Sequence, residues 1–127
     1  MTQEEKVEFI NQYHEAEKLF KEANSFIKSY ENLLKNKDFK TVIMEGYFKN
    51  ELFRLVESQK MFTKKSTPQT IEWSKEQDKI IQDKLLAISN FKEYLDDIKL
   101  KHKLLEKDMN DLKKEYEEVI TSLNEEV

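Results

Sequence analysis

The chain has 127 residues, a formal charge of -4, one glycine, one proline and no cysteine. So few turn-forming residues exclude a fold of many short strands joined by tight turns. The absence of cysteine excludes disulfides, thiol catalysis and cysteine-based zinc sites. Charged and hydrophobic residues each make up 38% of the chain, which is typical of long helices and coiled coils. We therefore expect an all-α protein, with residues 1–127 forming a single elongated helical domain.

The first predicted helix spans residues 3–34, where apolar side chains recur at alternating steps of four and three. This is the seam of a coiled coil, and its members are Phe9, Tyr13, Ala16, Phe20, Ala23, Ile27, Tyr30 and Leu34. Leu19, Phe26 and Leu33 add a third apolar position to each repeat. A contact between two helices does not bury this third position. We therefore expect a homo-oligomer, and specifically a dimer in which four helices pack along the hairpin arms.

The second predicted helix spans residues 38–61, after a break at which Asn36 or Asp38 can act as the N-cap. Its apolar residues cover much of the helix circumference rather than one stripe, which indicates an enclosed element. Gly46 lies inside this helix, where glycine costs about 1 kcal/mol relative to alanine. We interpret Gly46 as a structural residue that permits the close approach of a neighbouring helix.

Residues 62–67 form the predicted loop, and the third helix is expected over residues 68–124. Thr67 as N-cap followed by Pro68 is a helix start signal. From Ile88 onward the apolar steps again alternate between three and four, whereas two successive steps of three lead from Leu85 to Phe91 and overwind the supercoil locally. The third helix matches the first two in length, which favours a long antiparallel hairpin. A compact three-helix bundle is the alternative.

Four residues of the second helix are candidates for binding a protein partner: Tyr47, Phe48, Glu51 and Arg54. Aromatic residues and arginine are frequent hot-spot types at interfaces. The other interpretation is an ordinary packed helix with Arg54 held by Asn50 or Glu51.

His102 falls on a core position of the third helix, where a polar residue fixes register at some cost in stability. We expect a structural role for it and no metal site, because no second ligand is placed at a suitable spacing. The chain contains no glycine-rich phosphate loop, nucleophile elbow or Ser/His/Asp order. We therefore predict no catalytic residues, no cofactor and no enzymatic activity.

Charge is unevenly distributed, since residues 35–65 carry eight basic and four acidic side chains while the flanking segments are acidic. A basic middle segment can attract nucleic acid, but interspersed acids, a pI of 5.4 and a single arginine argue against this partner. No apolar stretch reaches the ~18 residues of a membrane span, and residues 1–5 lack the order of a signal peptide. We expect protein partners and no membrane partner.

Residues 38–56 (DFKTVIMEGYFKNELFRLV) resemble a signature, Gly-Tyr-Phe followed by Arg-Leu-Val, of a small, largely uncharacterised helical protein family of tailed bacteriophages. Residues 87–95 match the same family more weakly. The resemblance implies a phage origin, no enzyme, and a leading helix, a middle helix and a long final helix. It supplies no ligand residues.

These observations lead to one main hypothesis. The protein is expected to be a non-enzymatic phage protein that oligomerises through coiled-coil helices and binds a protein partner, in virion assembly or as a minor virion component. It would be located in the host cytoplasm, in the virion or in both. The alternatives are an intracellular inhibitor or sponge acting on a host or defence factor, and a weak nucleic-acid-binding accessory protein.

Overall fold

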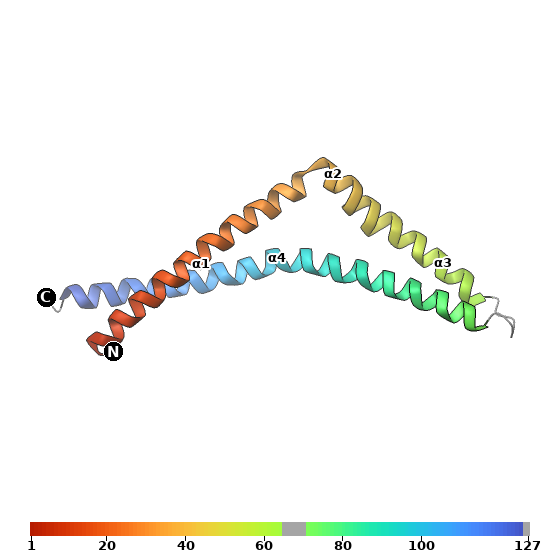
Figure 1. Ribbon diagram of the computed structural model, residues 1–127. Coiled ribbons are helices and arrows are strands. Elements are labelled where there is room, and N and C mark those ends of the chain that lie inside the picture. Colours follow the sequence, from red (N-terminus) through yellow and green to blue (C-terminus); the bar gives the residue numbers. More distant parts are fainter. Residues whose placement is uncertain (65–70, 126–127) are drawn as a thin grey trace. The chain divides into compact units, whose positions relative to one another are not determined.

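The computed structural model describes residues 1–64 and 71–125, and within these ranges it contains helices and no strand (Figure 1). The elements are α1 (Gln3–Lys35), α2 (Lys37–Phe39), the π-helix η1 (Lys40–Glu51), α3 (Leu52–Lys64) and α4 (Ile71–Glu125). The predicted all-α class and long C-terminal helix are confirmed. Because α3 continues to Lys64, the predicted loop does not begin at residue 62. The predicted start signal at Thr67 and Pro68 lies outside the described residues.

The chain divides into two compact units. The first comprises Met1–Glu31 and Ile98–Val127, and the second comprises Asn32–Asp97. The first unit pairs two segments that are distant in the sequence, and the second is one continuous stretch whose two halves pack together, as the expected hairpin requires. In the described part of the chain, no helix combines the length and apolar character needed to cross a membrane.

In the first unit, the start of α1 lies beside the end of α4 and runs antiparallel to it (Figure 1). Lys6 Nζ donates to Ser122 Oγ at 2.8 Å, and one repeat further along α1 the rings of Tyr13 and Tyr116 stack with centroids 4.1 Å apart. The buried apolar side chains of this unit are Tyr13, Ile27, Tyr30, Met109 and Val119. They all belong to the predicted seams. Leu105, which the same spacing placed on the seam of the third helix, is 37% exposed, so the seven-residue pattern identified most of this core but not every member.

In the second unit, η1 and α3 pack along the first part of α4. Phe48 lies with its ring centroid 5.4 Å from that of Phe91, and Gln59 Nε2 donates to Asp78 Oδ1 at 3.2 Å. Leu55 is the most enclosed side chain, with 1% of its surface exposed. The buried line of α4 has a member at every seventh position: Ser74, Ile81, Ile88 and Leu95.

The helix ends are held by local hydrogen bonds. Thr2 and Glu5 form a capping box, in which the Glu5 N–H donates to Thr2 Oγ1 and the Thr2 N–H donates to Glu5 Oε2. At the predicted break Asn36 is extended, with ψ of 123°, and its Oδ1 accepts from the Phe39 N–H at 2.9 Å. Asn36, one of the two predicted candidates, is therefore the N-cap.

The segment Lys40–Glu51 departs from the expected α-helix because it is wound as the π-helix η1. A π-helix repeats its hydrogen bonds every five residues, and half-buried Ile43 and buried Phe48 lie five residues apart. This spacing explains why the apolar residues fit no single stripe of an α-helix. The wider turn brings both Tyr47 and Phe48 to Phe91, with ring centroids 6.1 Å and 5.4 Å away.

The sequence-based explanation of Gly46 is wrong in one respect. A Cβ at this position would lie 3.2 Å from the carbonyl oxygen of Thr41, which belongs to the same π-helix. No atom of another described helix lies within 4 Å of that Cβ. The glycine relieves a contact inside its own turn, five residues back, rather than the approach of a neighbouring helix.

We expect Gly46→Ala to raise the midpoint of thermal unfolding, because the gain in helix propensity is about 1 kcal/mol. The Thr41 carbonyl needs to shift by only a few tenths of an ångström to admit the methyl group. Circular dichroism melts measure the effect. Asn50→Ala, at an exposed position of the same π-helix, is the matched control. A lower midpoint for Gly46→Ala together with a higher one for Asn50→Ala would show that the turn cannot accept a side chain at residue 46.

Candidate functional site

The four predicted partner-binding residues occupy different environments in the second unit. Phe48 is 8% exposed and packs against Phe91, which supports the core-packing interpretation for this residue. Tyr47 is half-buried beside it, with ring centroids 5.7 Å apart. Glu51 and Arg54 have side-chain exposures of 34% and 60%. Of the four, only Arg54 has most of its side chain exposed to solvent, and Glu51 is half-buried like Tyr47.

Glu51 and Arg54 form a two-point ion pair across one helical turn. Arg54 Nε donates to Glu51 Oε2 at 2.9 Å, and a terminal guanidinium nitrogen donates to Oε1 at 2.5 Å. These hydrogen bonds lower the pKa of the Glu51 carboxyl, and the Arg54 and Lys84 charges act in the same direction. Of the two predicted partners of Arg54, the structure therefore selects Glu51 rather than Asn50, and both carboxylate oxygens of Glu51 accept a hydrogen bond from the guanidinium.

His102 is part of a polar contact within the first unit. One imidazole nitrogen, Nε2, lies 2.7 Å from Asn24 Oδ1, and the ring stacks on Phe20 with centroids 6.1 Å apart and 11° between the planes. His102 and Asn24 are both half-buried. No role for Asn24 was predicted from the sequence. Its position four residues after Phe20, beside the seam, was the available signal. The contact fits the structural role predicted for His102, since a polar pair inside an apolar seam favours one alignment of the helices.

A second aromatic cluster lies nearer the chain ends of the same unit. Tyr13 stacks on Tyr116 at 11°, and exposed His14 meets both rings edge-on at 5.8 Å and 5.7 Å. Burial is the main cause that raises the pKa of the Tyr13 hydroxyl, and the neighbouring Glu17 carboxylate adds to it. The Tyr13 hydroxyl therefore stays protonated at neutral pH and serves packing.

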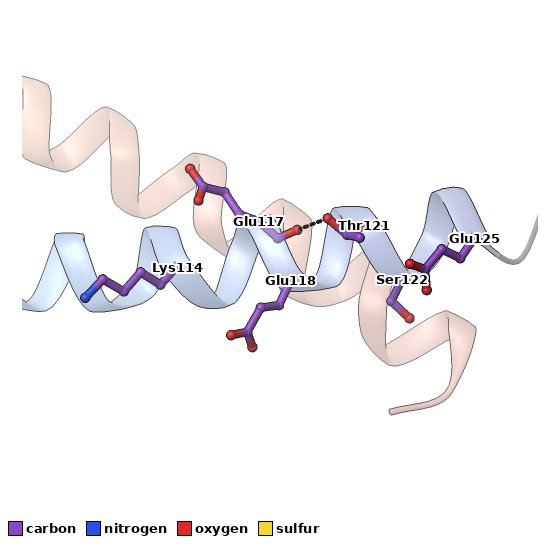
Figure 2. A pocket seen from close by; sticks show the side chains of 6 residues that line it. All are labelled: Lys114, Glu117, Glu118, Thr121, Ser122 and Glu125. Carbon is purple, nitrogen blue, oxygen red and sulfur yellow. Dashed lines mark hydrogen bonds between the residues drawn. The ribbon is translucent and has the colours of Figure 1, made fainter.

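A shallow groove lies along the end of α4, and Figure 2 shows the six side chains that line it. They are Lys114, Glu117, Glu118, Thr121, Ser122 and Glu125. The Thr121 hydroxyl donates to the Glu117 backbone carbonyl at 2.9 Å, so it is engaged by its own helix. Within the described residues no three histidine or acidic side chains are grouped as a metal ion would require. The groove is an open, acidic helix surface.

The most distinctive surface features are two lines of exposed apolar side chains. Leu19 and Phe26, on α1 in the first unit, are 62% and 54% exposed, and Leu33 continues their seven-residue spacing in the second unit at 40%. A comparable line runs along the first part of α4, through Trp73, Ile80, Ala87 and Tyr94. The first line was predicted from the sequence. The second was not, because its residues differ in type and only the buried line beside them reveals their common face.

Comparison of the chain with models of protein families, with curated proteins and with solved structures finds no match. The interpretation of the site therefore depends on its geometry. Two lines of exposed apolar residues, each beside a closed seam, are surfaces suited to contacts with other helices.

We expect His102→Leu to raise the free energy of unfolding by about 1 kcal/mol, because an apolar side chain replaces a polar one in the seam. The Asn24 side chain, which is half-buried, can form a hydrogen bond with water in place of the lost contact with His102. The same variant should relax the pairing specificity and give more than one species in size-exclusion chromatography. His14→Leu is the control, since His14 is exposed and its replacement should leave the species distribution unchanged. A decrease in stability for His102→Leu would mean that the Asn24 contact outweighs the gain from apolar burial.

Proposed function

We propose that the protein is a non-enzymatic, self-associating helical protein of a tailed bacteriophage that binds a protein partner, in virion assembly or as a minor virion component. The phage assignment is supported by the resemblance of residues 38–56 and 87–95 to small helical phage proteins. The interaction role is supported by the exposed surface of the helices.

One observation carries the interaction role. Leu19 and Phe26 lie one heptad apart on α1, more than half of each side chain is exposed, and neither belongs to the buried core of the first unit. Monomeric proteins seldom leave such aligned apolar residues uncovered. Positions next to a coiled-coil seam are the ones that a third or fourth helix covers. A second copy of the chain would cover these apolar residues by packing its own α1 against the same line.

We expect the protein to sediment as a dimer or larger species at micromolar concentration. The double variant Leu19→Gln/Phe26→Gln should shift the equilibrium toward the monomer of 15.4 kDa, because it removes the apolar area that drives association. Val7→Gln serves as the control, since Val7 is 51% exposed on the same helix but lies off the line. A wild-type protein that sediments only as the monomer would contradict the self-association.

The virion role has a separate test. A minor virion component should be present in stoichiometric copies in phage particles purified by density gradient, as measured by quantitative mass spectrometry. An assembly factor should accompany precursor particles and be lost on maturation. Absence from both kinds of particle would favour the alternative of an intracellular inhibitor or sponge.

A further inference from the structure

The line of exposed residues on α4 has a regular geometry. Trp73, Ile80 and Tyr94 are 56%, 46% and 57% exposed, and Ala87 completes the seven-residue spacing at an exposed position. We call these four residues the α4 stripe. Each of them directly precedes a member of the buried line, whose exposures run from 3% to 8%. Since the buried line stays on one face of α4 throughout, the stripe stays on one face beside it. The 22 residues from Trp73 to Tyr94 extend over about 30 Å of helix.

A line of carboxylates accompanies the stripe. Glu76, Asp83 and Asp97 each lie three residues after a stripe member, and residues three apart are neighbours on a helix surface. None of the three makes an ion pair with any residue in the described ranges. On the other side of the stripe lies Lys84, which is close enough to Glu51 to help lower the pKa of that carboxyl. The outer border of the stripe also carries Lys79, but it is mainly acidic, and these three carboxylates make no ion pair within the described residues.

The acidic border selects among possible occupants. Unpaired carboxylates repel nucleic-acid phosphates and anionic lipid headgroups, whereas they attract lysine and arginine side chains. Aromatic residues at intervals along the stripe are of the type that anchors protein interfaces. An amphipathic helix with apolar residues at seven-residue intervals and a basic border would match both the spacing and the charge of this surface.

The α3 helix of a second copy is a weaker match than a separate partner. On α3, Arg54 is paired with Glu51, and Lys60 lies 3.0 Å from Glu57. These contacts neutralise most of the positive charge that α3 could offer to the carboxylates of a second copy. The unpaired charge of the α4 stripe is therefore better matched by a basic helix from a different protein than by α3 of a second copy.

We propose that the α4 stripe is the docking site for a basic amphipathic helix of a partner protein. This inference deepens the proposed function, on which it rests, by stating where the partner binds and what chemistry it carries. The site lies wholly within the second unit and is separate from Leu19 and Phe26 in the first. Apolar contacts along the stripe provide the affinity, and ion pairs to Glu76, Asp83 and Asp97 orient the incoming helix.

The test uses the full-length protein and two synthetic helical peptides with the same leucine repeat, one bordered by lysine and the other by glutamate. Trp73 is the sole tryptophan of the chain and lies on the stripe, so its fluorescence reports directly on occupancy. We expect the lysine-bordered peptide to shift the Trp73 emission to the blue and to bind about tenfold more tightly than the glutamate-bordered one. Equal binding of the two peptides would overturn the proposal.

Charge reversal gives the sharper result. Glu76→Lys/Asp83→Lys should invert the preference between the two peptides. The matched control is Asp111→Lys/Glu118→Lys, which makes the same change of charge at exposed positions of the same helix, also seven residues apart, in the first unit. This control should retain the wild-type preference. An equal inversion in the control would mean that only the net charge of the protein matters, and the docking site would be refuted.

A variant of the stripe itself separates this inference from the proposed function. Ile80→Gln/Tyr94→Gln should abolish peptide binding while leaving the helix content and the sedimentation behaviour unchanged. If it instead disrupts self-association, a second copy covers the stripe and the proposal of a basic partner helix fails. If the peptide does not bind but the wild-type protein still oligomerises through Leu19 and Phe26, the docking site fails and the self-association stands.

Discussion

The burial of one face of α4 is the constraint on which the rest of the structure depends. This helix has 55 residues, many more than a helix needs to form its backbone hydrogen bonds. It lies beside α1 in one unit and beside η1 and α3 in the other. Helices in proteins gain most of their stability from such apolar packing rather than from propensity. The side chains left outside this packing define the surfaces available for contacts with other molecules.

The two units bury their seams with different local geometry. In the first unit two α-helical segments meet through a seven-residue pattern that also contains the polar contact between His102 and Asn24. In the second unit the π-helix η1 changes the spacing to five residues, so that Tyr47 and Phe48 both reach Phe91. The π-helical winding is uncommon and is often associated with functional sites. In this winding a Cβ at Gly46 would lie 3.2 Å from the Thr41 carbonyl oxygen, five residues back in the same π-helix.

The exposed apolar lines and the charged side chains of the surface have different roles. Leu19 and Phe26 form a line suited to a second copy, and the α4 stripe forms one whose acidic border favours a basic partner. The Glu51–Arg54 pair, by contrast, satisfies its charges locally. Most charged residues of the chain keep the long helices hydrated, and individual exposed ion pairs of this kind contribute little to stability.

The sequence by itself determined the helical class, the seams and the principal break. Spacing alone was sufficient to place Tyr13, Ile27 and Met109 in the core, because residues at heptad positions share one face wherever the chain is helical. The cap at Asn36 was likewise predictable, since the asparagine side chain bonds to backbone groups three residues away whatever packs around it.

Only the tertiary structure decided which neighbours these faces meet. The contact of Asn24 with His102 and the exposure of the α4 stripe depend on residues far apart in the sequence. The stripe illustrates the reason. Ile80 and Ile81 are both apolar neighbours in the sequence, yet one is 46% exposed and the other 7%. Ile81 lies on the seven-residue line that also contains Ile88, and spacing indicates that this line faces a seam. How much of the adjacent line stays exposed depends on how closely a distant segment approaches, which local spacing does not specify.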